Sequence, residues 1–349
     1  MAVVTNHLPH PNGTAAGRQL WAWAEAVMRA GHVVDAWCWG AAPVGLEPPE
    51  WCRWEPFSPP TGWRVKAETL RRPRQAIATS GWRPDVEPDV VWVDDWGSQP
   101  AVPAALRSVL CVHYSVSIDA TATRTWSPAV VQDLRAERRA LRTATRSVAL
   151  SERIRRSVGA GGVAPATTSL PTASVTPVDE PVAVMLANWA WPPNRVALAR
   201  LLRFWPDVRE RVRGATLLLA GRNLDDVGTI AGVRVLGEVS DPLEVMARAA
   251  VFVFPCPSSS GVKVKVMDAM FAGLPVVTTP AGVEGLAVDE RAAFVVDVRG
   301  FDDHLVRVLS DGDGRARVAE SARAQITAGH HPDVAAALRL DAMAAVEKL

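Results

Sequence analysis

The sequence predicts an α/β protein with two domains, each built around a parallel sheet. The chain has 349 residues, whereas a single domain typically has about 100 to 200. Short apolar segments alternate with segments of helical spacing on both sides of a stretch rich in Gly, Pro, Ala and Thr at 159–181. Because parallel strands need crossover connections that are usually helical, this alternation indicates βαβ units on each side of a linker.

The composition limits the class of protein. With 38 basic against 37 acidic residues the net charge is +1, which argues against a nucleic acid or a membrane surface as partner. No apolar run reaches the ~18 residues of a membrane span, and the start lacks a signal-peptide pattern, so we expect a cytoplasmic protein with no membrane span. The four cysteines, Cys38, Cys52, Cys111 and Cys256, form no C-x-x-C pair, which favours reduced thiols over disulfides or a zinc site.

The first domain is predicted to cover residues 1–160. A short apolar strand at 1–6 leads through a loop into a helix at 15–30 and a second strand at 32–39, which together make a βαβ unit. Later apolar segments and one Arg- and Ala-rich segment extend this series. They predict strands at 89–93, 108–112 and 147–150 and a helix at 130–145.

The second domain is predicted to cover 182–330, after a linker at 161–181. Its strands and helices alternate as they do in the first domain. A final segment at 331–349 has apolar residues at helical spacing, and this terminal helix could pack on either domain, including back on the first. The predicted elements of the second domain are strands at 182–187, 215–220, 233–236, 251–254, 276–278 and 293–296 and helices at 194–204 and 243–250.

A pair of lysines marks the stretch at 258–279, SSSGVKVKVMDAMFAGLPVVTT. The chain has four lysines among its 38 basic residues, and two of them, Lys263 and Lys265, lie here. The alternating Val-Lys-Val-Lys-Val run would by itself favour a strand, yet strands are predicted on both sides of it. We therefore expect the crossover helix at 261–272, with Gly273 ending it.

The predicted helix places polar groups where a phosphate binds. Lys265 and Asp268 share one of its faces, and the backbone N–H groups of Gly261 and Val262 lie at its start. A strand end, a loop of small residues and a helix N-terminus form the usual anion site of open α/β sheets. We therefore expect a diphosphate beside Lys265 and a ribose hydroxyl bonded to Asp268. The alternative is that the two lysines belong to a solvated face.

Several segments resemble one enzyme family. Residues 217–223 (LLLAGRN), 233–241 (VRVLGEVSD) and 258–286 resemble the C-terminal domain of family 4 glycosyltransferases, and the loop at 9–13 (PHPNG) and residues 191–194 (WPPN) are similar to that family too. The resemblance implies a GT-B fold, in which two Rossmann-like domains face each other across a cleft. It also implies retaining transfer of a sugar from a nucleotide-diphosphate donor, bound on the C-terminal domain, to a small-molecule acceptor, with natural-product biosynthesis as one setting. Lysine charge and helix N-terminal donors can stabilise the leaving diphosphate, so we expect no metal and no cofactor besides the nucleotide sugar.

The resemblance implies roles for individual residues. Lys265 would stabilise the leaving diphosphate as a catalytic residue, and Asp268 stands where the family has a glutamate that binds the ribose. Glu284 lies in a loop that approaches the donor, Gly13 would let backbone come near the leaving phosphates, and backbone groups of 237–239 would face the nucleobase. The full donor-binding set implied is Gly13, Arg222, Gly237, Val239, Ser260, Gly261, Val262, Lys263, Lys265, Asp268 and Glu284.

One departure from the family pattern keeps alternatives open. The family pairs two glutamates eight positions apart, and here Ser260 replaces the first while Asp268 shortens the second. A hydroxyl cannot accept hydrogen bonds as a charged carboxylate does. The alternatives to sugar transfer are a non-catalytic GT-B homologue that binds nucleotide or a partner enzyme, and a nucleotide-sugar epimerase on the same fold.

Three features of the first domain are further candidates. His113 follows the strand at 108–112, at the edge where ligands bind such sheets, and is the candidate catalytic residue that contacts the donor sugar or the acceptor; a packed histidine is the alternative. Asp94 and Asp95 end another strand, where they line the acceptor site or cap a helix rather than hold a metal. The Pro- and Arg-rich segment 51–79 is either an acceptor loop or an ordinary solvated connection.

Overall fold

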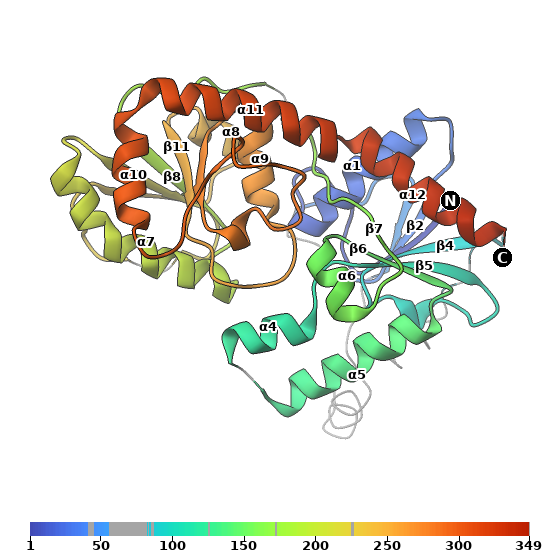
Figure 1. Ribbon diagram of the computed structural model, residues 1–349. Coiled ribbons are helices and arrows are strands. Elements are labelled where there is room, and N and C mark those ends of the chain that lie inside the picture. The colour runs from blue at the N-terminus through green and yellow to red at the C-terminus, as the bar shows by residue number, and fades with distance from the viewer. Residues whose placement is uncertain are drawn as a thin grey trace. The chain divides into compact units, whose positions relative to one another are not determined.

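The computed structural model describes residues 1–40, 45–55, 82, 84, 87–124, 126–171, 173–224 and 227–348, which form two compact units (Figure 1). Unit 1 consists of Met1–Ser169 together with Pro332–Leu349, and unit 2 consists of Leu170–His331. Most of the segment predicted as an acceptor loop, 51–79, lies outside the described residues. None of the helices in the described part of the chain has the length and apolar character needed to cross a membrane.

Unit 1 contains a parallel sheet with the strand order β3-β2-β1-β4-β5-β6-β7. From the neighbouring strands β1 and β4 the chain runs in opposite directions, to β2 and to β5. The carboxyl ends of β1 and β4 therefore form the topological switch point of this sheet, where open α/β sheets bind ligands. The strands are β1 (Ala2–Thr5), β2 (Asp35–Cys38), β3 (Cys52–Trp54), β4 (Val90–Asp94), β5 (Arg107–Val112), β6 (Arg146–Ala149) and β7 (Gly162–Val163), and the helices are α1 (Ala15–Arg29), α4 (Val116–Thr123), α5 (Pro128–Thr143), α6 (Glu152–Val158) and α12 (Pro332–Glu347), with a 3-10 turn η1 (Gln99–Ala101).

The terminal helix α12 is part of the core of unit 1. It packs on α1 and on strands β4 and β5, as the red helix beside the blue one in Figure 1 shows. Strands β1, β4 and β5 are buried along almost their whole length, as expected for parallel strands covered on both faces. Under α12, Trp23 of α1 and Trp92 of β4 meet edge to face with ring centroids 5.7 Å apart. An exposed ion pair between Arg29 and Asp333 (2.8 Å) also joins α1 to α12.

The predicted boundary of the first domain needs correction. The segment predicted as linker, 161–181, contains β7, which pairs with β6, and the two units divide between Ser169 and Leu170. A two-residue strand is too short to show a period of two in the sequence. Strand β3 and helices α4 and α6, which are all short, were likewise not predicted.

Unit 2 contains a second parallel sheet with the strand order β10-β9-β8-β11-β12-β13. Here the neighbouring strands β8 and β11 lead in opposite directions, to β9 and to β12, so their carboxyl ends form the switch point of this sheet. Helix α8 is shorter than predicted, and α10 and α11 were not predicted. The elements are β8 (Val182–Leu186), α7 (Pro192–Arg211), β9 (Thr216–Ala220), β10 (Val233–Gly237), α8 (Pro242–Met246), β11 (Val251–Phe254), α9 (Val264–Ala272), β12 (Val276–Thr278), a 3-10 turn η2 (Pro280–Gly282), β13 (Phe294–Val295), α10 (Phe301–Ser310) and α11 (Gly312–His330).

Helix α9 begins three residues later than predicted. Gly261 has φ of +83°, in the left-handed region, and Lys263 has a non-helical backbone with φ −89° and ψ 82°. The regular helix therefore starts at Val264, and the N–H groups of Gly261 and Val262 belong to the loop before it. At the other end Gly273 adopts the left-handed conformation (φ +90°) and ends the helix, as predicted.

Candidate active site

Lys263 lies inside the loop that connects β11 to α9. The residue is 3% exposed, and its Nζ donates hydrogen bonds to the carbonyl oxygens of Ser260 (3.3 Å) and Gly261. These charge-assisted bonds hold the loop in shape from within. The alternative that this lysine belongs to a solvated face is therefore wrong.

Lys265 projects from the first turn of α9 toward the start of α7. Its Nζ donates a hydrogen bond to Oδ1 of Asn194 and lies 4.4 Å from the ring centroid of Phe254 and 5.8 Å from that of Trp191. Asn194 is itself held in place, because its Nδ2 donates to the carbonyl oxygen of Asn188 (2.7 Å). The ammonium group thus has a fixed position against two aromatic rings.

The position and the charge of Lys265 suit an anion. Lys265 and Asn194 follow β11 and β8, the two strands that flank the switch point of unit 2. Burial lowers the pKa of Lys265 to about 7, and the neighbouring charge of Lys263 acts in the same direction. A phosphate placed beside Nζ would offset both effects and keep the lysine charged.

The other predicted donor residues of unit 2 are brought to one edge of its sheet. Because all strands of a parallel sheet end at the same edge, the segments that follow them meet there. Asp268 lies one turn after Lys265 on α9 and is half-buried. The exposed Arg222 forms an ion pair with Glu238 at 3.5 Å. Residues that end or follow β9, β10, β11 or β12 are Arg222, Gly237, Val239, Ser260, Gly261, Val262 and Glu284.

Ser260 and Gly237 show two further details of this edge. Ser260, which stands where the family has its first glutamate, is 3% exposed, so a side chain longer than serine would need space that is now filled. Gly237 has φ of +69°, and its carbonyl oxygen accepts a hydrogen bond from the N–H of Gly221 (2.7 Å). Its left-handed backbone explains why a glycine is suited to the end of β10.

Gly13 lies in unit 1, in the loop between β1 and α1. Its N–H donates to the carbonyl oxygen of His10 (3.0 Å), and a Cβ at this position would lie 3.0 Å from the same oxygen. The next residue, Thr14, caps α1 by accepting a hydrogen bond from the N–H of Gly17. The loop therefore approaches the switch point of unit 1 as tightly packed backbone.

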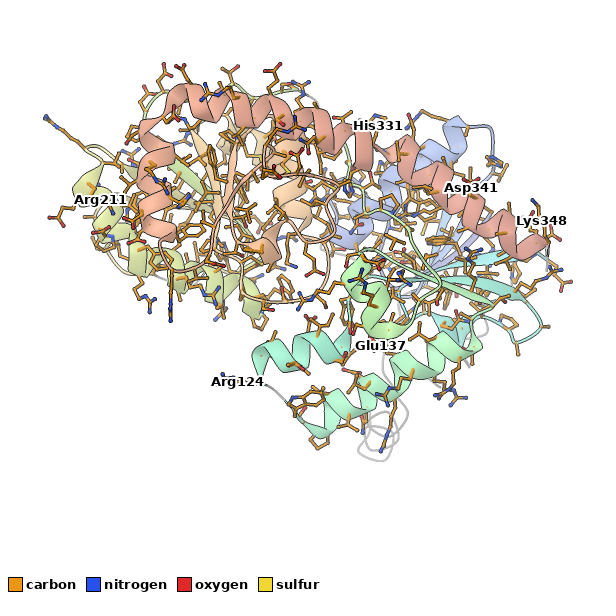
Figure 2. All side chains as sticks on the ribbon, viewed as in Figure 1. Arg124, Glu137, Arg211, His331, Asp341 and Lys348 are labelled. Carbon is orange, nitrogen blue, oxygen red and sulfur yellow. The ribbon has the colours of Figure 1, made fainter. Side chains whose placement is uncertain are left out.

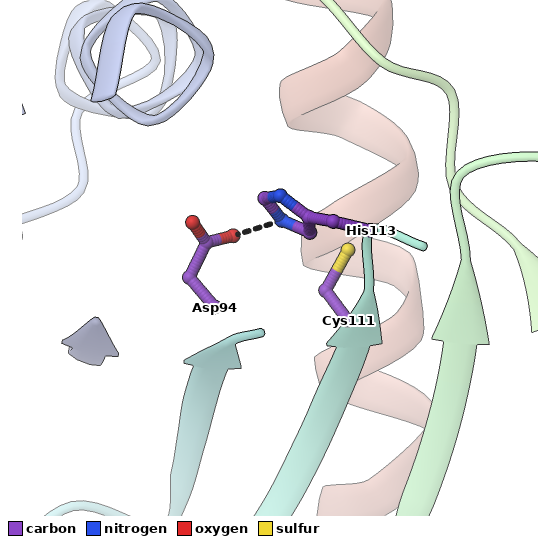
Figure 3. A group of neighbouring side chains, drawn as sticks. All are labelled: Asp94, Cys111 and His113. Carbon is purple, nitrogen blue, oxygen red and sulfur yellow. Dashed lines mark hydrogen bonds and ion pairs between the residues drawn. The ribbon is translucent and has the colours of Figure 1, made fainter. Parts of the chain in front are cut away.

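A buried ion pair lies at this switch point. Asp94 ends β4 and His113 follows β5, and Nε2 of His113 lies 3.0 Å from Oδ1 of Asp94 (Figure 3). Asp94 is 2% exposed. The ring of His7, which follows β1, stacks on that of His113 with centroids 6.4 Å apart. Asp94 thus holds the candidate catalytic histidine, a role that the sequence did not indicate.

The pair determines the charge of both histidines. Burial opposes charging of His113, but the carboxylate of Asp94 raises the pKa of His113 well above its usual value. Burial would also raise the pKa of Asp94, but the charge and hydrogen bond of His113 hold it below its usual value. Burial and the charge of His113 lower the pKa of His7 to about 4. At neutral pH the cluster therefore holds ionised Asp94, charged His113 and neutral His7.

Cys111 on β5 is the third member of the group in Figure 3. One ligand atom each of Asp94, Cys111 and His113 lies within 4.8 Å of the others, a spacing that a metal ion could use. Oδ1 of Asp94 is already engaged by His113, however, and the positive charge of Arg339 also acts on Asp94. We therefore describe the cluster as an ion pair.

Residues 180–311 match the family of glycosyl transferases group 1, which corresponds to family 4. Unit 2 therefore resembles the donor-binding half of the group 1 glycosyltransferases. The match lies within unit 2 and contains every donor residue predicted there. It confirms the resemblance inferred from the sequence. None of the curated proteins matches this chain.

Solved structures resemble this chain over both units. Sucrose-phosphate synthase from Thermosynechococcus elongatus is 16% identical with a TM-score of 0.70, and 99% of each chain is covered. HepE from Anabaena, in complex with UDP-glucose, is 14% identical with a TM-score of 0.68, again with 99% of each chain covered. A mutant of TarM from S. aureus is 13% identical with a TM-score of 0.58; the match covers 72% of this chain and 54% of TarM, so it spans about half of that protein. These similarities establish the fold and confirm the predicted GT-B class.

The sequence did not indicate every residue of this site. Asn194, the partner of Lys265, lies 71 positions away along the chain, and only its place in the WPPN motif hinted at a role. Asp94 was considered as an acceptor-site or capping residue, and its place at a strand end next to that of His113 was the signal that could have paired them. His7 carried no signal that distinguishes it from a packed histidine.

Proposed function

We propose that this protein moves a sugar, with retention of configuration, from a nucleotide-diphosphate donor to a small-molecule acceptor. The observation that carries the proposal is the position of Lys265 at the switch point of unit 2, with Nζ fixed by Asn194 and the ring of Phe254. Both units contribute a polar group at the switch point of a parallel sheet, which is where such folds bind ligands.

Lys265 would act on the leaving group. A diphosphate gains negative charge as its bond to the sugar breaks, so a positioned ammonium stabilises the transition state more than the ground state. In the free protein the pKa of Lys265 is about 7, so the lysine is only partly charged at neutral pH. Donor binding would complete its charge, which couples proton uptake to binding.

Other residues would orient the donor. Asp268, one turn along α9 from Lys265, would accept hydrogen bonds from ribose hydroxyls. Backbone groups at Gly237 and Val239 would contact the base, and Glu284 would approach the sugar. His113, charged and held by Asp94, would contact the donor sugar or the acceptor from unit 1.

UDP-sugars are the first donors to test. The HepE structures contain UDP-glucose or UDP, and the TarM structure contains UDP. The acceptor has no such guide, and we propose a small molecule because the chain and its N-terminal half are small.

Nucleotide binding tests the donor site. Thermal unfolding would be measured with UDP, GDP, TDP and ADP, with and without magnesium, on the wild type, on Lys265→Ala and on Lys348→Ala. Lys348 lies exposed at the end of α12 and serves as the matched control (Figure 2). A ligand at about 100 times its dissociation constant adds roughly 2.7 kcal/mol of stability. We expect one nucleotide to stabilise the wild type and Lys348→Ala but not Lys265→Ala; stabilisation of all three, or of none, contradicts the proposal.

Ser260 is the observation that favours a second candidate, a non-catalytic homologue that binds nucleotide. Such a protein would pass the binding test but would not transfer sugar to any acceptor or to water. Mass spectrometry of the UDP-sugar after incubation with candidate acceptors separates the two, because transfer releases UDP. An epimerase would instead convert the UDP-sugar into an isomer when no acceptor is present. Chromatographic separation of the isomers before mass spectrometry would reveal that product.

A further inference from the structure

Arg339 is a buried arginine in the core of unit 1. It lies on α12, is 1% exposed, and its Cζ lies 5.3 Å from the ring centroid of Trp23 and 5.4 Å from that of Trp92. One guanidinium nitrogen, Nη1, donates to the carbonyl oxygens of Pro165 (3.1 Å) and Ala335 (2.9 Å). A charge in such a place is costly unless opposite charge or hydrogen bonds compensate for it.

The surroundings of Arg339 lead directly to Asp94. Trp92 and Asp94 are two residues apart on β4 and so point to the same face of the sheet. Nε1 of Trp92 donates a long hydrogen bond of 3.5 Å to Oδ1 of Asp94. On the opposing helix α1, Gln19 lies one turn before Trp23 and shares its buried face.

This layer contains polar atoms that the rest of unit 1 does not satisfy. Among the residues that the structure describes, Nε of Arg339, Oδ2 of Asp94 and Oε1 of Gln19 are buried and have no hydrogen-bond partner. One of these atoms belongs to a cation and one to an anion. In a buried layer their attraction is screened far less than it would be in water.

We propose that Arg339 is a positioning residue for the Asp94–His113 pair: its buried positive charge holds Asp94 ionised and facing His113. The arrangement is a buried row of charges in the order cation, anion, cation, formed by Arg339, Asp94 and His113. The first member comes from the end of the chain, so the terminal helix completes the charge of the site in unit 1.

The charges that act on these groups support the proposal. Burial lowers the pKa of Arg339, and the charge of Asp94 opposes that effect. For Asp94, burial raises the pKa, whereas the charge and hydrogen bond of His113 and the charge of Arg339 act in the opposite direction. A second cation near Asp94 also repels a proton from His113. The proposal therefore implies that loss of Arg339 raises the pKa of His113.

One consequence for the pH dependence of the reaction rests on the proposed function. If His113 contacts the donor sugar or the acceptor, the charge of Arg339 shifts the upper limb of the pH–rate profile to lower pH. A merely structural arginine would change stability without moving that limb.

Titration of His113 by NMR tests the proposal without any substrate. The ring carbon and proton signals of His113, assigned through a His113→Gln variant, would be followed in the wild type, Arg339→Gln and Arg339→Lys. The control is Arg107→Gln, because Nη1 of Arg107 donates to the carbonyl oxygens of Val346 and Glu347 and so also docks α12. We expect Arg339→Gln to raise the midpoint of His113 by about half a pH unit or more, while Arg339→Lys and Arg107→Gln leave it nearly unchanged.

Two results would overturn the proposal. One is a His113 midpoint that is the same in folded Arg339→Gln as in the wild type, and the other is an equal shift in Arg107→Gln, which would assign the effect to helix docking. If Arg339→Gln does not fold, the wild type alone can test the proposal, because the coupling between two charged groups is reciprocal. The NMR signal of the Nε–H group of Arg339 should then change as His113 titrates. A signal that stays constant would refute the proposal. Failure of sugar transfer in the wild type would contradict the proposed function but would not alter these titrations.

Discussion

Nζ of Lys265 on α9 bonds Oδ1 of Asn194 at the start of α7, and this contact joins the two connections that leave the switch point of unit 2. It fixes a cation at the carboxyl edge of the sheet, beside the ring of Phe254. The fixed position matters because a preorganised charge stabilises a transition state without first having to reorient.

A carboxylate beside Lys265 should weaken donor binding. In Asn194→Asp the new negative charge would pair with the ammonium and repel a diphosphate, so we expect nucleotide affinity to fall by about tenfold or more. Asn194→Ala removes the hydrogen bond without adding charge, so its nucleotide affinity should fall less than that of Asn194→Asp. Calorimetric titration with UDP compares the three proteins; equal affinity in Asn194→Asp and the wild type would place the phosphates elsewhere.

Nucleotide binding should depend on pH through Lys265. Its pKa is about 7 in the free protein, so above that pH the site must take up a proton when the diphosphate binds. We expect the dissociation constant to rise between pH 7 and 9, by at most about tenfold per pH unit. Calorimetry in buffers of different ionisation enthalpy measures the number of protons that the protein takes up when the nucleotide binds. Lys265→Arg, which stays charged, should bind with a flatter profile, and an equally steep profile would assign the proton to another group.

Replacing Lys265 by an apolar residue should stabilise the protein while abolishing donor binding. Folding lowers the pKa of this lysine from 10.5 to about 7. The lysine therefore destabilises the folded state at every pH below its unfolded pKa, and the penalty grows as the pH falls toward 7. Lys265→Met should therefore raise the free energy of unfolding at pH 7 by roughly 2–4 kcal/mol, with a smaller difference at pH 10. Urea unfolding at both pH values measures this, with exposed Lys348→Met as a control that should not change. A less stable Lys265→Met at pH 7 would show that the bond to Asn194 and the aromatic contacts outweigh burial.

Removing the anion of the Asp94–His113 pair should affect both charge and stability. Folding lowers the pKa of Asp94, so the stability that Asp94 contributes is lost as the pH falls through its folded pKa. Folding raises the pKa of His113, so the stability that His113 contributes is lost as the pH rises through its folded pKa. In Asp94→Asn the buried His113 loses its partner, and we expect about 3 kcal/mol of destabilisation at neutral pH. NMR titration should place the pKa of His113 below its usual value in this variant, and a value still above it would mean that another anion holds the ring.

Chelation of metal ions should leave nucleotide binding and the proposed sugar transfer unchanged. In the proposed donor site, lysine charge and backbone donors would serve the diphosphate, and Oδ1 of Asp94 bonds His113. Protein treated with EDTA should bind nucleotide and transfer sugar as untreated protein does. A different result would show instead that the atoms in Figure 3 bind a metal. In that case EDTA would abolish the activity, and zinc would restore it in the wild type but not in Cys111→Ala.

Local sequence patterns predicted the buried central strands well, but they missed several helices, including α10 and α11, and the irregular backbone. Strand β11 spans the predicted residues 251–254, because a short apolar run followed by small residues has few other conformations. Helix α9 was placed three residues too early, because nothing in the sequence shows that Gly261 adopts a positive φ. That backbone also turns Lys263 inward, where its charge supports the loop.

By itself the sequence determined two parallel α/β units, the enzyme family and the lysine that marks the candidate donor site, because periodicity and short motifs are properties of neighbouring residues. Only the tertiary structure decided what those residues touch. It brought Asn194 to Lys265 and Asp94 to His113 because parallel strands end at one edge of their sheet, however far apart they lie in the chain. It also placed Arg339 of the last helix in the core of the first unit, since a contact between the two ends of a chain depends on packing and leaves no local pattern.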